Sequence, residues 1–119
     1  MKISVTKRFT FEAAHLLPMY EGPCANLHGH SYVLEVTVAD IVGSDGMVMD
    51  FSTLNQIVKP IIGALDHSFL NNVVETPTAE NILLWINEKL KDVGLWAEML
   101  TLWETENSYA TLLCEDSAT

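Results

Sequence analysis

The sequence predicts an α+β fold, in which an antiparallel sheet carries two helices on one of its faces. Two long segments, residues 2–15 and 28–42, alternate apolar and polar side chains in the manner of half-buried strands. Two segments between residues 50 and 94 carry apolar side chains at helical spacing instead. Because the two helices stand together between pairs of strands, the order of elements favours an antiparallel sheet with its helices grouped on one side.

The first half of the chain is predicted to form strands joined by a loop and a turn. Residues 16–25 contain two prolines and a glycine, which indicate a loop between the two long strands. Gly43-Ser44-Asp45-Gly46 indicates a turn. We expect residues 47–49 to return from this turn as a third strand and so to complete a hairpin.

The second half is predicted to contain the two helices, a connector and a further pair of strands. Asp50 or Ser52 is suited to cap the first helix, and Thr76-Pro77-Thr78 is a typical helix start. Gly94 is suited to end the second helix. The expected bounds are a first helix up to Leu65, a connector over residues 66–72, and strands over residues 99–105 and 109–114.

Composition excludes several classes of protein. A chain of 119 residues is expected to form a single domain, residues 1–119. Its net charge of −10 argues against binding to nucleic acids or to anionic membranes, both of which need basic surfaces. No apolar run approaches the roughly 18 residues that span a bilayer, and the charged N-terminus does not resemble a signal peptide. We therefore expect a soluble, cytoplasmic protein with reduced cysteines.

Three of the four histidines are predicted to lie on one face of the sheet. His28 and His30 stand two residues apart at the start of a strand, so their side chains point the same way. His15 shares the parity of the apolar residues of the first strand and can face the other two. Three imidazoles leave one position of a tetrahedral zinc ion open, which is typical of catalytic sites, although other first-row metals also bind such ligands. For any one of these histidines alone, an ordinary hydrogen-bonded residue is the favoured interpretation, and the pattern of three favours a metal site.

Cys24 and the pair Asp66-His67 are candidates for proton transfer. Cys24 stands in the loop just before His28, where a nearby cation would lower its pKa and allow it to act as a base or nucleophile. The alternative is a small buried apolar residue. Asp66 and His67 would supply an orienting carboxylate and a base if the chain turns between them, but such a pair also caps helices.

Glu104 is a carboxylate within the otherwise apolar segment Leu102-Trp103-Glu104-Thr105. On an exposed edge strand it would simply face solvent. In a binding site its two oxygens can instead accept the paired N–H donors of a pterin or guanine ring. Periodicity does not decide between these interpretations.

Together these residues resemble the 6-pyruvoyltetrahydropterin synthase and 6-carboxytetrahydropterin synthase family. The similar segments occur in the family's order and cover nearly the whole chain. They are residues 9–15, 24–32, 46–51, 65–71 and 77–81, together with Glu104-Thr105.

The resemblance implies the tunnelling fold. In this fold each subunit contributes a four-stranded antiparallel sheet with two helices, and three subunits join their sheets into a barrel. Two such trimers stack, so the resemblance implies a homo-hexamer with active sites between subunits.

The resemblance also implies a role for each candidate residue. The ligands of a zinc ion would be His15, His28 and His30. Cys24 would be the thiol that abstracts a proton, with Asp66 and His67 as its relay partners. Glu104 would anchor the pterin ring, and Thr105 and Thr78 would help to line the pocket.

The implied reaction converts 7,8-dihydroneopterin triphosphate into 6-carboxy-5,6,7,8-tetrahydropterin, acetaldehyde and triphosphate, a step toward 7-deazaguanines such as queuosine. The short motif Cys-Ala-Asn-Leu-His-Gly-His resembles the bacterial branch that forms this product. Pro23 and Asn55 stand where lysines are common in that branch, so a pterin without the triphosphate is a rival substrate.

Three alternatives remain open. The same site could form 6-pyruvoyltetrahydropterin or cleave a dihydropterin side chain in the manner of an aldolase. The protein could instead be a non-catalytic module that binds a pterin or purine and holds a structural metal. A zinc hydrolase would use the three histidines and be indifferent to Glu104.

Overall fold

The computed structural model describes residues 1–22 and 25–114. The candidate base Cys24 and its neighbour Pro23 therefore lie outside the described residues. The described elements, in chain order, are β1 (Ile3–His15), β2 (His28–Asp40), α1 (Phe51–Leu65), β3 (Ser68–Phe69), a 3-10 turn η2 (Leu70–Asn72), α2 (Ala79–Asp92), β4 (Met99–Thr105) and β5 (Ser108–Leu113).

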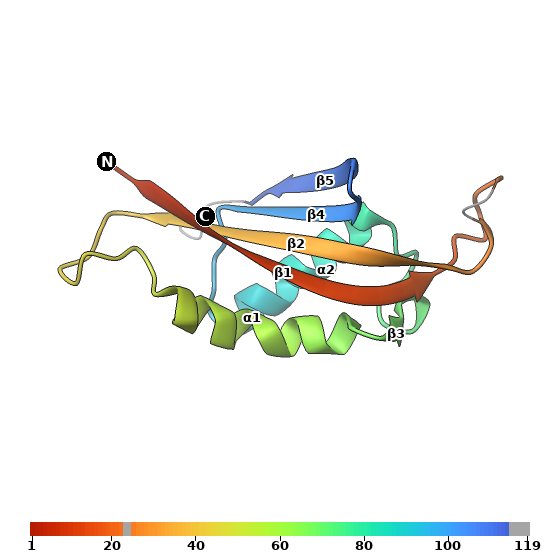
Figure 1. Cartoon of the computed structure of the whole chain (residues 1–119), viewed down its shortest axis with the longest axis horizontal. Coiled ribbons are helices and arrows are strands. Elements are labelled where there is room, and N and C mark those ends of the chain that lie inside the picture. Colours follow the sequence, from red (N-terminus) through yellow and green to blue (C-terminus); the bar gives the residue numbers. More distant parts are fainter. Residues whose placement is uncertain (23–24, 115–119) are drawn as a thin grey trace.

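The strands form one sheet in the order β3-β1-β2-β4-β5. The four longer strands are antiparallel, and the two-residue β3 pairs in parallel with the end of β1. Figure 1 shows both helices under the same face of this sheet. Helix α1 packs on β1, whereas α2 packs on β4 and β5. The predicted α+β architecture, with two helices on one face of an antiparallel sheet, is confirmed.

The apolar core lies between the sheet and the helices. Alternate residues are buried there from Phe9 to His15 on β1 and from Tyr32 to Val38 on β2, including Phe11 and Leu34. Because the same parity continues to His15, the strand carries this histidine into the end of the core, where it is 1% exposed. The helices contribute Leu54, Val58, Ile61, Ile62, Leu65, Ile82, Leu83, Ile86 and Leu90.

Both helices begin at the expected caps. The Asp50 carboxylate accepts a hydrogen bond from the Ser52 N–H, and the Thr78 hydroxyl accepts one from the Asn81 N–H. Within the described residues, neither helix is long and apolar enough to cross a membrane.

The predicted third strand over residues 47–49 is wrong. The Gly43 N–H donates to the Met47 carbonyl across the turn, and the Met47 N–H donates to the Asp45 carboxylate. Only three residues separate this turn from the Asp50 cap, so no length remains for a ladder. Val48 and Met49 pack against the core instead, and their hydrophobicity reflects burial rather than strand pairing.

The connector after α1 contains a strand that the sequence did not indicate. Ser68 and Phe69 pair with Ala13 and Ala14, which places the connector along the edge of β1. The side chain of Asn71 then bonds the backbone of Leu16 twice, accepting from its N–H (3.0 Å) and donating to its carbonyl (2.9 Å). This clasp holds residues 66–71 against the end of β1.

The clasp can be tested by replacing Asn71 with alanine. The change leaves both polar groups of the Leu16 backbone without these partners, so we expect a loss of about 1–3 kcal/mol in the free energy of unfolding. Chemical denaturation at a fixed protein concentration measures it. Asn72→Ala is the matched control, because Asn72 is exposed and should change stability by less than about 0.5 kcal/mol. Equal effects of the two variants would contradict the clasp.

Candidate metal centre and adjoining clefts

The antiparallel register of β1 and β2 brings the three predicted histidines together. His15 lies opposite His28, and Ala13 lies opposite His30, so all three side chains emerge at one end of the sheet on its helix side. Their rings lie 4.6–5.1 Å apart, centroid to centroid. One ring nitrogen from each falls within 4.8 Å of the others, close enough to hold a metal ion.

Two backbone carbonyls fix the ring orientation of His15 and His28. His15 Nδ1 lies 2.8 Å from the Pro77 carbonyl, and His28 Nδ1 lies 2.7 Å from the Asn26 carbonyl. Because a carbonyl only accepts, each Nδ1 carries the hydrogen and each Nε2 presents a lone pair. The two Nε2 atoms are 3.0 Å apart and face each other. Two facing ring nitrogens at this distance can share a proton or a metal ion, and the third imidazole beside them fits the metal ion.

The third imidazole also lacks a partner. His30 Nε2 is buried and has no hydrogen-bond partner among the described residues. Burial lowers the pKa of His30, and His15 and His28 act in the same direction while Glu104 opposes them. A buried ring nitrogen without a hydrogen-bond partner destabilises the fold, but it is suited to bind a metal ion. The donor set therefore fits a bound metal ion.

Glu104 faces the histidine cluster from β4. The β4–β5 register shifts between Trp103 and Thr105, and such a bulge re-aims the residue that it leaves without a partner. Glu104 Oε1 lies 3.4 Å from His30 Nε2, a long contact that lacks hydrogen-bond geometry. The carboxylate thus approaches the metal centre while its side chain remains 29% exposed to a ligand.

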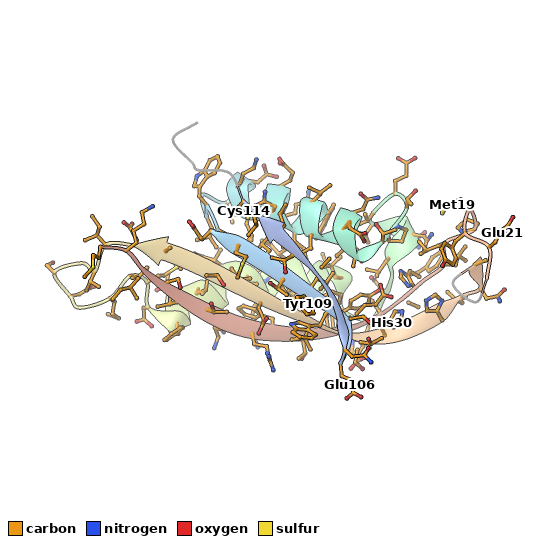
Figure 2. The ribbon with its side chains drawn as sticks, turned by 90° about the horizontal axis from the view of Figure 1, so that it is seen from above. Met19, Glu21, His30, Glu106, Tyr109 and Cys114 are labelled. Atoms are coloured by element: carbon orange, nitrogen blue, oxygen red, sulfur yellow. The ribbon has the colours of Figure 1, made fainter. Side chains whose placement is uncertain are left out.

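An open cleft of about 560 Å³ lies beside this carboxylate, and we call it the Glu104 cleft. His30, Trp103, Glu104 and Thr105 are among the residues that line it. Figure 2 shows His30 near the β4–β5 turn, whose tip carries Glu106, and Glu106 also lines the cleft. The size suits a bicyclic heterocycle with a short side chain.

The two predicted threonines differ in their placement. Thr105 lines the Glu104 cleft, and its hydroxyl donates to the Asn107 side chain. Thr78 caps α2 and does not line that cleft, but the preceding Pro77 supplies the carbonyl that orients His15.

Asp66 and His67 form a pair at the edge of β1. The Asp66 carboxylate accepts a hydrogen bond from the Glu12 N–H (2.9 Å), and the same oxygen lies 3.1 Å from His67 Nδ1. The Glu12 hydrogen bond, followed by the contribution of His67, holds the pKa of Asp66 below its usual range. His67 adopts a left-handed backbone conformation (φ 57°), which makes the turn that the pair requires.

His67 shares a second cleft with the metal centre. This His67 cleft, of about 470 Å³, is lined by His67 and Ser68 on one side and by Gly29, His30 and Ser31 on the other. Gly29, His30 and Ser31 also line the Glu104 cleft. A ligand that extends over this part of β2 can therefore reach both Glu104 and His67.

A hydrogen-bonded group on the open face of the sheet supports Trp103, which lines the Glu104 cleft. Glu35 accepts from the Trp103 indole (3.1 Å) and from the Arg8 guanidinium (3.0 Å). These two hydrogen bonds, in that order, lower the pKa of Glu35. The sequence did not indicate this group, because its three members come from separate strands. The sequence likewise did not indicate that the Pro77 and Asn26 carbonyls orient His15 and His28, because every residue has a backbone carbonyl.

Comparison with known proteins gives a consistent set of relatives. A family model described as 6-pyruvoyl tetrahydropterin synthase matches residues 4–115. The 6-carboxy-5,6,7,8-tetrahydropterin synthase of Synechocystis is 46% identical over 99 residues, which cover 76% of this chain and 77% of that protein. The dihydroneopterin monophosphate aldolase of Pyrococcus furiosus is 40% identical over 109 residues, covering 87% and 91%. The structure of Caenorhabditis elegans 6-pyruvoyl tetrahydropterin synthase matches with a TM-score of 0.87, at 27% identity and 97% coverage of both chains.

The metal centre predicts a specific loss on mutation. We expect the purified protein to bind about one transition-metal ion per chain, and His30→Ala to bind less than about a tenth as much, because two imidazoles hold such ions poorly. Elemental analysis after dialysis measures the content. His67→Ala is the control, since His67 lies outside the cluster. Equal metal content in both variants would refute the assignment.

Proposed function

Because this chain belongs to the 6-pyruvoyl tetrahydropterin synthase family, we propose that it is a zinc-dependent lyase acting on the side chain of a dihydropterin. The specific reaction that we propose converts 7,8-dihydroneopterin triphosphate and one water into 6-carboxy-5,6,7,8-tetrahydropterin, acetaldehyde and triphosphate. Its product would feed the synthesis of 7-deazaguanines such as queuosine. The observation that carries this proposal is the carboxylate of Glu104 beside a cluster of three imidazoles.

Glu104 would bind the heterocycle. A carboxylate accepts two parallel hydrogen bonds, and the 2-amino group and adjacent ring N–H of a pterin offer two parallel donors. Trp103 and Thr105, which flank Glu104 on β4, would contact the ring. Thr78 would help to form the pocket from the start of α2, next to the Pro77 carbonyl that orients His15. This orientation directs the substituent at carbon 6 along the floor of the cleft, toward His30.

His15, His28 and His30 would hold the zinc ion. A zinc ion in this position would bind the side-chain hydroxyl oxygens and acidify the neighbouring carbon-bound protons. The Pro77 and Asn26 carbonyls would keep the ligating Nε2 atoms of His15 and His28 aimed at the ion, as hydrogen-bonded partners of metal ligands commonly do.

Cys24 and His67 would transfer the protons. The Asp66 carboxylate, which the Glu12 N–H holds in place, would keep a hydrogen on His67 Nδ1 and leave Nε2 free to accept or return a proton. Cys24 would act from the loop that precedes His28, a role that rests on the family motif. Together the two groups would carry protons between the side chain and the ring.

We also propose that the chain assembles as a homo-hexamer. Within the described residues, β1 pairs with no strand on its outer side from Ile3 to Phe11, and β5 pairs only with β4. Open edges of this length favour pairing with another chain. Joining β1 to β5 of a neighbour would close three sheets into a barrel, and two barrels would stack.

A second candidate is aldolase-type cleavage of a dihydroneopterin phosphate. The Pyrococcus furiosus relative, named dihydroneopterin monophosphate aldolase, favours it, and so do Pro23 and Asn55, which stand where lysines are common in the carboxy-forming branch. Cleavage between the first two side-chain carbons would release 6-hydroxymethyl-7,8-dihydropterin and glycolaldehyde that keeps its phosphate.

Product analysis tests both candidates. The zinc-loaded protein is incubated with 7,8-dihydroneopterin triphosphate, and in parallel with the monophosphate, and the products are identified by mass spectrometry. We expect carboxytetrahydropterin with acetaldehyde from the triphosphate. Phosphorylated glycolaldehyde would identify the aldolase instead. Consumption of neither substrate by metal-loaded protein would overturn the proposed lyase activity.

A cysteine variant separates an enzyme from a binding module. We expect Cys24→Ala to retain its metal and lose turnover by at least about a hundredfold, since general base catalysis typically contributes that much. Cys114→Ala is the control, because burial raises the pKa of the Cys114 thiol and makes it a poor base. If Cys24→Ala turns over substrate like the wild type, the thiol has no role in proton transfer.

A further inference from the structure

Trp103 forms part of the wall of the Glu104 cleft and lies inside the sheet rather than at its edge. Its strand, β4, runs between β2 and β5. Directly opposite it stand Val33 on β2 and Tyr109 on β5. Joining the edges of the sheet to other chains, as in the proposed hexamer, therefore leaves Trp103 and its partners on β2 in place.

The indole of Trp103 is held from both neighbouring strands. From β2, the Glu35 carboxylate accepts a hydrogen bond from the indole N–H at 3.1 Å. From β5, the Tyr109 ring packs against the indole, with ring centroids 4.1 Å apart and planes inclined by 37°. An indole has one donor and no acceptor, so with Glu35 as its partner it offers no hydrogen bond to a ligand. Trp103 thus presents an aromatic surface in one fixed orientation.

Glu35 is itself held in position. It lies directly opposite Arg8 across the β1–β2 pair and diagonally from Trp103 across the β2–β4 pair, so both side chains are within its reach. Its Oε1 atom accepts from the indole, and its Oε2 atom accepts from the Arg8 guanidinium at 3.0 Å. Each carboxylate oxygen therefore has a partner, and the Glu35 side chain is only 25% exposed. These contacts oppose any movement of the carboxylate away from the indole.

The part of β2 that lines the cleft leaves space for a flat ring beside Trp103. Gly29 and Ser31 line the cleft there, and a Cβ added at Gly29 would meet only the Ala13 carbonyl oxygen within 4 Å, at 3.5 Å. Glu104 lines the same cleft and can accept paired N–H donors. Glu104 would therefore bind the edge of a planar heterocycle, while the indole would pack against the ring itself.

We propose that Glu35 is a positioning residue, which fixes the indole of Trp103 as the wall of the Glu104 cleft against which a planar heterocycle packs. The proposal rests on the proposed function in taking this heterocycle to be the dihydropterin ring. An indole that is already fixed loses little conformational freedom when a ligand binds, whereas a freed indole would have to be ordered again. Removal of the Glu35 carboxylate should therefore weaken binding of the ring even though Glu35 does not touch it.

The position of the indole is tested first, without a ligand. Proton exchange of the indole N–H groups is followed by NMR in the zinc-loaded, assembled protein, and Trp103→Phe identifies the Trp103 signal. We expect this N–H to exchange at least about tenfold faster in Glu35→Ala, which lacks its acceptor. Glu35→Gln keeps an acceptor oxygen, so its exchange should stay within about threefold of the wild type. The signals of Trp85 and Trp96 are internal controls and should not change.

Binding of the ring is then measured by calorimetry. The probe is pterin without a substituent at carbon 6, because it has the ring donors and no side chain to react. We expect Trp103→Ala to weaken binding by at least about tenfold, because a stacking contact is lost, and Glu35→Ala by about fivefold. If the contact is equally strong before and during the reaction, Glu35→Ala should raise the KM of the proposed substrate and leave kcat within about twofold.

Two controls separate this role from a general effect on the fold. Glu88→Ala is matched to Glu35→Ala, because the ion pair of Glu88 with Lys91 also spans 3.0 Å but lies on α2, outside the cleft. It should change the affinity for pterin by less than about twofold. In a double-mutant cycle, Trp103→Phe keeps an aromatic ring but lacks the indole N–H, so in that background Glu35→Ala should also have less than about a twofold effect.

Four results would overturn the proposal: no binding of pterin by the wild type, unchanged exchange of the Trp103 N–H in Glu35→Ala, equal affinities of Glu35→Ala and Glu88→Ala, or an undiminished effect of Glu35→Ala in the Trp103→Phe background. Failure of the proposed function has a different signature. If pterin binds and the cycle gives the expected coupling but no dihydropterin is consumed, the lyase is refuted and the role of Glu35 stands. If substrate turns over with a KM that Glu35→Ala leaves unchanged, the lyase stands and the role of Glu35 is refuted.

Discussion

The register of β1 against β2 is the constraint on which the candidate site depends. It sets His15 opposite His28 and Ala13 opposite His30, so three imidazoles converge without any loop having to carry them. A slip by one residue would turn one strand's histidines to the other face of the sheet and break the cluster. The buried aromatic and aliphatic residues of the same parity, among them Phe11 and Tyr32, fix that register. Core packing and the histidine cluster are thus specified by a single alternation.

Two backbone carbonyls from outside the paired strands orient the histidines that the register brings together. Asn26, just before β2, orients His28 through its carbonyl, while Pro77, just before α2, orients His15. The second contact joins the sheet to the start of a helix that is distant in sequence. Turning either ring would break its hydrogen bond to a carbonyl, so the two contacts keep the Nε2 atoms of His15 and His28 facing each other.

The sequence was informative wherever side-chain periodicity carries the signal. The two long strands, the helix caps at Asp50 and Thr78, and the histidine cluster all follow from spacing alone. It misled at residues 47–49, where apolar side chains serve packing under a turn too close to a helix cap for strand pairing. Contacts made by backbone carbonyls, the Asn71 clasp and the Arg8–Glu35–Trp103 group depend on which segments meet in space, which no local pattern encodes.

The strand order divides the candidate site into two ends. Glu104, on β4, offers a carboxylate to a ligand with N–H donors, whereas Asp66 and His67 lie at the opposite edge, beside β1. The histidine cluster lies between them, because β1 and β2 separate β3 from β4 in the sheet. The order of the strands therefore decides which part of a bound molecule meets the carboxylate and which part meets His67.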